Sequence, residues 1–423
     1  MTKKIDSILK EVLEKSNPSE DEINNIENHL NKFLARVEKK IKSMGVEVDI
    51  FIGGSFAKKT MIRKDCYDID VFFRFDGKHK GEFSKLAGKI LQGFNIVKVH
   101  GSRDYFRLKA DKDVFFEIIP VLKVSNPKGA DNITDLSYSH VKYINQKVKK
   151  KILDEIKLAK VFCYANNCYG AESYIRGFSG YSLELLIHYY GGFLKFVKAI
   201  AKLKCKEVID IEKDYKNKSQ VLMDVNSSKL NSPIILIDPT YKQRNALAAL
   251  SDETLKKLQK ICKSFLKNPS VKAFEVKKID FEKLGKNAQK KKFDFVLLEA
   301  ETNRQEGDIA GSKLLKFYNH LSEEITRFFE IKNNEFVYEG EKTARYFFAV
   351  KSRGEILHDG PMINDVNNVK KFRKEHAKAF IKSHKVYAKE KISFSFKEFI
   401  EKWKVKNKTK IREMGVVGMK GIN

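Results

Sequence analysis

Cysteine is scarce in this chain, and the cysteines present are not arranged for metal or disulfide chemistry. The 423 residues include Cys66, Cys163, Cys168, Cys205 and Cys262. No two of them form a CxxC pair, and their number is odd. The sequence therefore indicates neither a zinc site nor a disulfide framework.

Long apolar runs are also missing. No stretch approaches the eighteen consecutive apolar residues that a membrane-spanning helix needs, and residues 1–10 lack the apolar core of a signal peptide. Hydrophobic residues nevertheless make up 42% of the chain, an ordinary share for a folded globular protein. We therefore expect a soluble, cytoplasmic protein with no membrane partner.

Acidic side chains are too few to balance the basic ones. The chain has 83 lysines and arginines against 55 aspartates and glutamates, giving a formal net charge of +28. Such an excess favours a polyanionic partner, because each neutralised phosphate releases a condensed counterion. A genome that favours lysine codons is the alternative explanation. The length predicts two to four domains.

A pair of carboxylates carries the strongest chemical signal. Asp68 and Asp70 lie in a run that reads as a β-strand, where residues two apart point to the same face. Two neighbouring carboxylates do not ionise comfortably without a cation. The preceding Gly53-Gly54-Ser55 turn permits close approach of a phosphate. Together they suggest a divalent-metal site for nucleotide chemistry; a solvated strand edge is the alternative.

Glu117 is the candidate for a third carboxylate. It interrupts the apolar run of residues 114–120. A carboxylate in a buried strand is costly unless it is paired or bound to a metal. Two-metal transfer sites need carboxylates that hold two cations about 3.5–4 Å apart. The residues alone leave open whether Glu117 binds a metal or forms a salt bridge.

Periodicity predicts an alternation of helices and strands. Expected helices cover residues 19–43, 56–64, 82–91, 146–166, 182–203, 312–330 and, with a basic composition, 368–410. Expected strands cover residues 46–52, 65–73, 94–100, 105–110, 114–121, 293–301, 335–338 and 346–351. Residues 231–243 read as turns. The strands near residue 300 and their helix predict a small sheet with helices on one face.

Several motifs together resemble a known family. Gly53-Gly54-Ser55, Lys59-Thr60 and Asp68-Ile69-Asp70 are similar to the polymerase-β-type nucleotidyltransferases. The segments 169–187, 238–251, 360–372 and 413–416 resemble the archaeal-type (class I) CCA-adding enzymes in the same order. The segment Arg176-Gly177-Phe178-Ser179-Gly180 is the most specific of them, since many transferases share the carboxylates.

The resemblance implies an α+β multidomain fold. Residues 1–140 would form a nucleotidyltransferase head, 141–267 a helical neck that recognises nucleotide and base, 268–360 a small α/β, RRM-like body, and 361–423 a basic, helical tail. Body and tail would bind tRNA. The implied activity is template-independent addition of C, C and A to the tRNA 3′ end from CTP and ATP with Mg²⁺. A homodimer is left open.

The resemblance also implies site residues. Asp68, Asp70 and Glu117 would be the catalytic, metal-binding carboxylates, although the family usually has aspartate at the third position. Nucleotide binding would fall to Ser55, Lys58, His140, Lys160 and Tyr169, and base recognition to Arg244. Without the family, His140 reads as a helix cap, Lys160 as a solvated side chain, Tyr169 as core packing and Arg244 as a phosphate clamp only.

Two other functions fit the same sequence. One is a related RNA nucleotidyltransferase that makes poly(A) or adds only A. The other is an inactive RNA-binding homologue, against which the clustered acids argue, because they would weaken RNA binding for no gain. The family usually has an arginine where Lys58 stands, and lysine offers a point charge instead of a bidentate fork.

Overall fold

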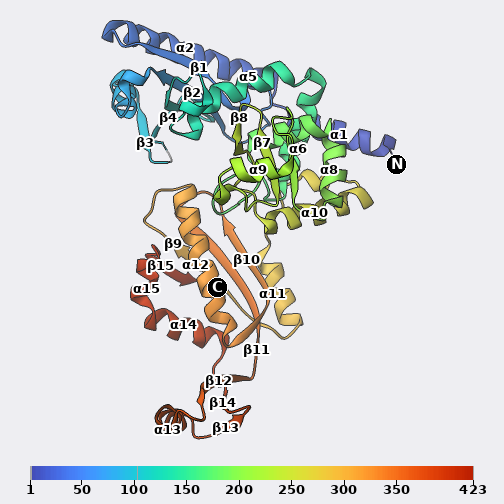
Figure 1. Ribbon diagram of the computed structural model, residues 1–423, viewed down its shortest axis with the longest axis vertical. Helices are drawn as coiled ribbons and strands as arrows, with labels where there is room; N and C mark the ends of the chain where they lie inside the picture. The colour runs from blue at the N-terminus through green and yellow to red at the C-terminus, as the bar shows by residue number, and fades with distance from the viewer. Residues whose placement is uncertain (1, 102, 423) are drawn as a thin grey trace. The chain divides into compact units, whose positions relative to one another are not determined.

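The computed structural model describes residues 2–101 and 103–422, and the chain divides into two compact units, residues 1–277 and 278–423. Figure 1 labels their helices and strands. None of the described helices has the length and apolar character needed to cross a membrane.

A five-stranded mixed sheet forms the first part of unit 1. Its strands are β1 (Val48–Ile52), β2 (Tyr67–Phe75), β3 (Ile96–Val99), β4 (Tyr105–Lys109) and β5 (Val114–Leu122), in the spatial order β1-β2-β5-β4-β3. β2 and β5 are parallel and the other neighbours antiparallel. The predicted strands are confirmed here, and the parallel pairing places the two carboxylate-bearing strands side by side.

Helix α2 (Glu20–Met44) packs on this sheet and shows why the local sequence folds as it does. Ser19 and Glu22 form a reciprocal capping box at its start, and Gly45 ends it with a left-handed φ of 63°. Its apolar stripe, which includes Ile26 and Phe33, joins the same buried cluster as the strands. The sheet therefore has one covered face behind the carboxylates.

The rest of unit 1 is mainly helical. It contains α1 (Thr2–Ser16), α3 (Gly54–Ala57), α4 (Phe83–Ile90), α5 (Ser137–Lys147), α6 (Lys150–Ala165), α7 (Gly180–Tyr190), α8 (Phe193–Lys202), α9 (Lys218–Asp224) and α10 (Asp252–Lys267), with a small sheet of β6 (Glu207–Ile209), β7 (Ile234–Asp238) and β8 (Tyr241–Asn245).

Four helical or turn predictions in unit 1 were wrong in detail. The expected helix 146–166 is divided at Val148, whose extended backbone ends α5. The expected helix 182–203 is broken by Gly191 and Gly192, with φ of 73° and 133°. The short basic helix is a single turn, and the turn-rich stretch 231–243 holds β7 and most of β8.

Unit 2 is built on a four-stranded antiparallel sheet of order β10-β11-β9-β15. It comprises α11 (Phe281–Lys290), β9 (Asp294–Glu301), α12 (Asp308–Thr326), β10 (Phe329–Tyr338), β11 (Thr343–Ser352), α14 (Phe396–Lys406), α15 (Lys408–Glu413) and β15 (Gly418–Gly421). Along β11, Tyr346 and Phe348 pack with α12 and α14, while the intervening Phe347 packs with α11. The expectation of helices on one face only was therefore wrong.

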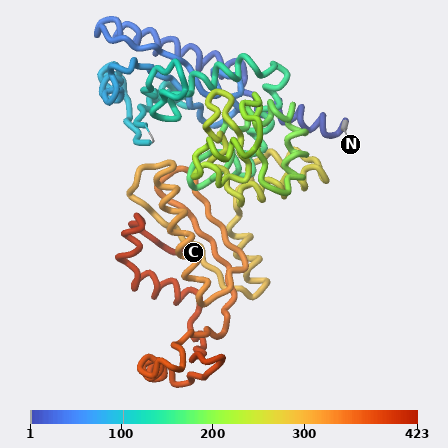
Figure 2. Tube along the Cα trace, in the orientation of Figure 1, coloured from blue at the N-terminus to red at the C-terminus, as the bar shows by residue number. Residues whose placement is uncertain are grey.

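Between β11 and α14 the chain makes a separate excursion, visible as the distal loop of unit 2 in the trace of Figure 2. It contains β12 (Glu355–Met362), α13 (Val366–Glu375), β13 (Ala379–Lys382) and β14 (Lys385–Lys391), and its three strands form a sheet of order β12-β14-β13. The prediction of continuous helix over 368–410 was wrong, because this range holds β13 and β14, and the consecutive charged residues 389–391 hide the strand pattern of β14.

Candidate active site

The two aspartates and the glutamate meet on neighbouring strands. Asp70 of β2 lies directly opposite Glu117 of β5 in the parallel register, and Asp68 lies opposite Phe115. Strand alternation places Asp68 and Asp70 on the same face. The structure thus brings together the three carboxylates that the sequence singled out.

Their electrostatics are those of crowded acids. Burial raises the pKa of Asp70 to about 6, with Asp68 adding repulsion and Lys58 opposing it. Burial, followed by repulsion from Asp68 and Asp70, raises the pKa of Glu117 to about 7, with Arg107 opposing the shift. Asp70 and Glu117 therefore hold their protons more tightly than they would in water, unless positive charge is supplied.

The donor set fits a divalent cation, and Arg107 occupies part of its place. Hard cations such as Mg²⁺ take carboxylate oxygens. The Arg107 guanidinium donates to Asp68 Oδ1 at 3.0 Å, lies 4.1 Å from the Phe115 ring centroid, and leaves its buried Nε without a partner. Arg107 is the residue opposite Glu117 on β4. Arg107 therefore competes with a metal ion for one oxygen of Asp68.

The glycine turn is shaped by its contact with Asp70. Gly53 N–H donates to the Asp70 carbonyl at 2.9 Å, and Gly54 has a φ of 62°. A Cβ on Gly54 would lie 1.7 Å from Asp70 Oδ2. Only glycine can bring the backbone this close to the carboxylate. The turn therefore sets Ser55 beside the face of the sheet that carries Asp68 and Asp70.

A buried ionic cluster lies beneath the turn. Glu184 of α7 accepts from Lys58 Nζ at 2.6 Å and from Thr60 Oγ1 and Lys160 Nζ, each at 2.8 Å. Lys160 Nζ also donates to Thr60 Oγ1 at 2.8 Å. Burial would raise the pKa of Glu184, yet the Lys160 and Lys58 ammonium groups lower it to about 2. The cluster ties the segment after the turn to α6 and α7.

Lys58 and Lys160 are buried and paired in this cluster. Lys160 is 2% exposed and Lys58 is 7% exposed, and both ammonium groups are engaged by Glu184. The solvated interpretation of Lys160 is therefore wrong. A direct contact of either lysine with a nucleotide stays a prediction.

The Arg176–Gly180 segment packs closely against Cys168 and Tyr169, and Tyr169 lines a neighbouring pocket. Gly177 carries the chain so close to Cys168 that a Cβ would lie 2.3 Å from the Cys168 carbonyl oxygen. Ser179 then caps α7 by accepting from Ser182 N–H. The Tyr169 hydroxyl lies close to Gly180, since a Cβ on Gly180 would be 2.9 Å from it. The pocket is lined by Ser55, Thr60, Met61, Ile62, Lys64, Cys66, Tyr67, Asp68, Lys160 and Tyr169.

The two remaining predicted residues meet at Asp238. His140 Nε2 lies 3.0 Å from Asp238 Oδ2, and Arg244 donates to the same oxygen at 2.6 Å. Tyr181 donates to Asp238 Oδ1 at 3.0 Å, and its ring stacks on His140 with centroids 4.0 Å apart. Burial lowers the pKa of His140, with Asp238 opposing that shift. His140 is thus a neutral ring held between a carboxylate and an aromatic face.

The sequence interpretation gave no role to four residues that organise the site: Arg107, Tyr181, Glu184 and Asp238. Glu184 could have been recognised by the argument used for Glu117, since it interrupts a wholly buried run, residues 182–187. The Lys58 ammonium lies 5.8 Å from the Tyr181 ring centroid. Tyr181 therefore links the Glu184 cluster to the Asp238 group.

Sequence comparisons find similarity to tRNA nucleotidyltransferases and CCA-adding enzymes. Residues 154–275 match the family model of the tRNA nucleotidyltransferase second domain. The CCA-adding enzyme of Archaeoglobus fulgidus is 28% identical over 417 residues, covering 93% of this chain and 88% of that protein. The enzyme of the same name from Nanoarchaeum equitans is 41% identical over 172 residues, covering 40% of this chain and 43% of that protein.

A solved structure shares the fold. A cytoplasmic RNA terminal U-transferase superposes with a TM-score of 0.51 at 13% identity, covering 66% of this chain and all of that one. At this identity the likeness concerns the fold alone. About two thirds of the chain therefore shares the fold of that RNA terminal U-transferase.

Proposed function

We propose that this chain, a relative of the archaeal CCA-adding enzymes, adds C, C and A to the 3′ end of tRNA from CTP and ATP. The observation that carries the proposal is the similarity to the Archaeoglobus fulgidus enzyme over 93% of the chain, with Asp70 and Glu117 paired in the sheet. The tRNA nucleotidyltransferase match over residues 154–275 supports the same substrate.

The proposed reaction is attack of the tRNA 3′-hydroxyl on the nucleotide α-phosphate, with pyrophosphate leaving. Asp68, Asp70 and Glu117 would hold Mg²⁺, which when bound supplies positive charge to the attacking and leaving oxygens. The raised pKa values of Asp70 and Glu117 support this assignment, because a bound cation offsets the burial that raises them most and the repulsion that adds to it. Asp68 would offer the oxygen that Arg107 does not hold.

The nucleotide would lie in the pocket beside the carboxylates. Ser55 lines that pocket together with Asp68, Lys160 and Tyr169. Ser55 is placed to meet the triphosphate, while Lys58 and Lys160 contribute positive charge from the Glu184 cluster. Tyr169 offers an aromatic face for the nucleotide.

Selection of the base would depend on the Asp238 group. Arg244 has a guanidinium fork suited to the hydrogen-bonding edge of a base. Asp238 fixes it at 2.6 Å, and His140 and Tyr181 hold Asp238 in turn. We assign base recognition to Arg244 and nucleotide binding to His140 on this basis.

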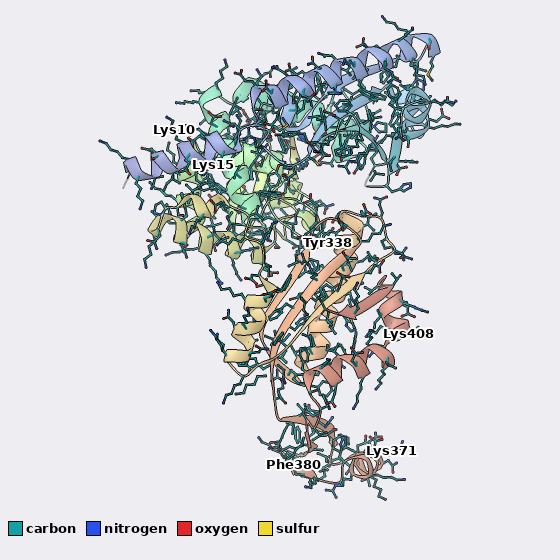
Figure 3. All side chains as sticks on the ribbon, turned by 180° about the vertical axis from the view of Figure 1, so that it is seen from behind. Lys10, Lys15, Tyr338, Lys371, Phe380 and Lys408 are labelled. Atoms are coloured by element: carbon teal, nitrogen blue, oxygen red, sulfur yellow. The ribbon has the colours of Figure 1, made fainter. Side chains whose placement is uncertain are left out.

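The proposal includes a division of labour along the chain. Residues 1–140 would serve as catalytic head and 141–267 as neck, while 268–360 and 361–423 would bind tRNA. Basic side chains project from many elements, among them Lys10, Lys15 and Lys408 in Figure 3. A net charge of +28 supports binding to a polyanion.

The test is incorporation of labelled nucleotides into tRNA transcripts that lack the CCA end. With CTP, ATP and Mg²⁺ we expect products three nucleotides longer than the substrate. Long A tails would favour a poly(A)-type enzyme and a single added A an A-only enzyme. No incorporation would favour an inactive RNA-binding homologue.

A further inference from the structure

The excursion of residues 355–391 in unit 2 has almost no core of its own. The structure describes all of these residues, and only Val386 and Ala388 are buried. Large apolar side chains such as Met362, Phe380 and Ile381 stay exposed; Figure 3 labels Phe380 on this module. Folded pieces below about 40 residues usually need a disulfide, a metal or a partner. These residues contain no cysteine.

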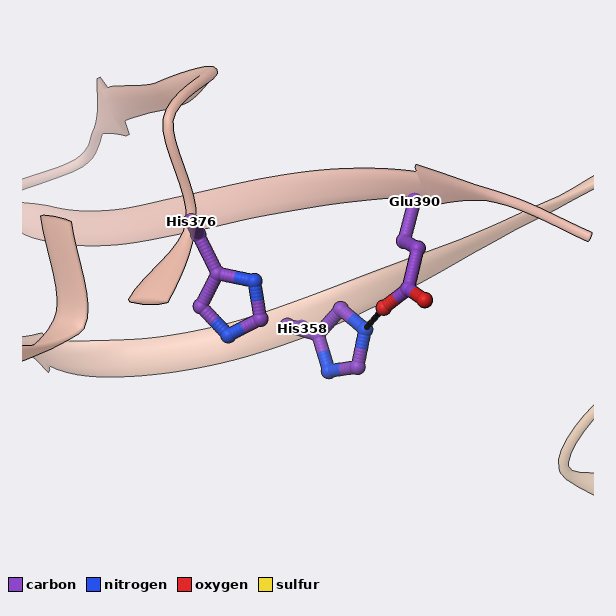
Figure 4. A group of neighbouring side chains, drawn as sticks. All are labelled: His358, His376 and Glu390. Atoms are coloured by element: carbon purple, nitrogen blue, oxygen red, sulfur yellow. Dashed lines mark hydrogen bonds and ion pairs between the residues drawn. The ribbon is translucent and has the colours of Figure 1, made fainter. Parts of the chain in front are cut away.

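Three metal-ligating side chains converge in this excursion. His358, His376 and Glu390 offer ligand atoms that all lie within 4.8 Å of one another (Figure 4). His358 Nε2 lies 2.8 Å from Glu390 Oε2. The His358 and His376 rings lie 4.6 Å apart. No other trio of His, Cys, Asp or Glu in the described part of the chain is as close.

Their places in the fold explain the convergence. β12 and β14 are antiparallel, with Ile356 opposite Glu390 and His358 opposite Ala388. His358 and Glu390 are thus diagonal neighbours on one face of the sheet. His376 ends α13 as its C-cap residue. The three ligands therefore come from three different elements.

His376 is held in place by packing. Its ring lies 4.6 Å from that of Phe372, one turn earlier in α13. Gly360 of β12 lets Phe372 approach, since a Cβ there would lie 2.9 Å from the Phe372 ring. The absence of a side chain at Gly360 allows α13 to sit close to the strand that carries His358.

We propose that His358, His376 and Glu390 form a Zn²⁺-type site that fastens α13 to the β12–β14 sheet. Two imidazoles and one carboxylate are a ligand set that Zn²⁺ takes, with water in the fourth position. Bond lengths near 2.0–2.1 Å put tetrahedral ligands about 3.3 Å apart, so ligand atoms now within 4.8 Å of one another need to close by up to about 1.5 Å. This site is distinct from the cluster of Asp68, Asp70 and Glu117, whose oxygen donors suit Mg²⁺.

The test uses the full-length protein, from which bound metal is first removed with a chelator that is then dialysed away. Excess Mg²⁺ is present so that Asp68, Asp70 and Glu117 do not bind the added Zn²⁺ or Co²⁺. Titration with Zn²⁺ and with Co²⁺, followed by metal analysis and visible absorption, should give one tightly bound equivalent. His358→Asn and His376→Asn should each lower the Zn²⁺ association constant by at least about 10–100-fold. Loss of a residue that only hydrogen-bonds to a metal ligand already lowers affinity by that factor.

Matched controls lie in the same excursion. His384→Asn changes an exposed histidine in the turn before β14, and Glu355→Gln changes an exposed glutamate on β12; both should bind like the wild type. Glu390→Gln should weaken binding. Equal Zn²⁺ retention in His376→Asn and the wild type, or no bound equivalent in the wild type, overturns the proposal.

Hydrogen exchange gives a readout that separates this site from a folding defect. Zn²⁺ should slow amide exchange in β12, β13 and β14 of the wild type but not of His376→Asn. Exchange in β9, β10 and β11 should be the same in both proteins. Zn²⁺ that binds without slowing exchange over residues 355–391 overturns the proposed fastening role.

Discussion

Asp70 and Glu117 are direct partners across two parallel strands. Burial raises the pKa of Glu117 most, and repulsion from Asp68 and Asp70 raises it further. A pairing of like charges in a partly buried sheet costs stability unless a cation joins them. Gly54 lies against the same Asp70, since a Cβ on Gly54 would lie 1.7 Å from Asp70 Oδ2. The geometry is therefore better suited to holding metal than to stabilising the fold.

Loss of Asp70 should stop nucleotide addition without stopping tRNA binding. Asp70→Asn removes a metal ligand, and metal stabilisation of transition-state charge is worth several kcal/mol. About 4 kcal/mol corresponds to a roughly 10³-fold lower rate. Single-turnover incorporation and filter binding of tRNA measure the two effects. Asp49→Asn on β1, whose carboxylate pairs with Lys123, is the control and should keep its rate.

In the metal-free protein, the contribution of Glu117 to the free energy of unfolding should fall as pH rises from about 4 to about 7. Its folded pKa of about 7 exceeds the ordinary value of 4.5, so the folded state binds more protons in that window. Its stabilising contribution is complete below pH 4.5 and lost as pH rises through 7.

Denaturant unfolding across this pH range, with a chelator present, measures that contribution. Glu117→Gln cannot titrate at this position and should show a flatter pH dependence of the unfolding free energy. Excess Mg²⁺ should flatten the wild-type profile in the same way. Identical profiles for variant and wild type would contradict the assignment.

Removing the Glu184 carboxylate should destabilise the protein strongly. Glu184→Gln leaves the buried ammonium groups of Lys58 and Lys160 without their counter-charge, a change that typically costs about 3–5 kcal/mol. Because the pKa of Glu184 is lowered to about 2, its stabilisation should be present above pH 4.5 and lost as pH falls toward 2.

Chemical denaturation at pH 7 tests the Glu184 prediction. Glu253→Gln, an exposed residue in the first turn of α10, is the matched control and should change the unfolding free energy by less than about 0.5 kcal/mol. A Glu184→Gln protein as stable as this control would show that the cluster does not hold α6 and α7 to the glycine turn.

Base selection should suffer when the Arg244 fork is lost. Arg244→Lys keeps the positive charge but not the bidentate geometry that Asp238 fixes. We expect the ratio of kcat/KM for CTP over UTP to fall by about 10-fold or more, the effect of roughly 1.4 kcal/mol. Lys242→Met, on an exposed neighbouring position of β8, should leave the ratio unchanged. An unchanged ratio in Arg244→Lys would remove Arg244 from base recognition.

The sequence was most informative where periodicity and chemistry agreed. Strand alternation predicted that Asp68 and Asp70 share a face, and burial cost marked Glu117; their meeting depends on the parallel pairing of β2 with β5, which no local pattern encodes. Glu184 escaped notice because its partners Lys58 and Lys160 are distant in the chain. β7 was missed because Asp238-Pro239 reads as a turn.

Other differences also have a physical cause. Gly191 and Gly192 break a helix whose apolar pattern continues through them, since their positive φ values stop the hydrogen-bond ladder. In the excursion of residues 355–391, charged residues occupy both faces of β14, so neither helical nor strand periodicity is visible. The ligands His358 and Glu390 become neighbours only through the strand pairing.

The measurement that bears most directly on the central claim is the mass of the tRNA 3′ fragment after reaction with all four nucleoside triphosphates and Mg²⁺. A tRNA lacking its end should gain two C residues and one A and then stop, and a tRNA that already ends in CCA should gain nothing. Incorporation of U or G, continued addition of A, or extension of the mature tRNA would contradict the account.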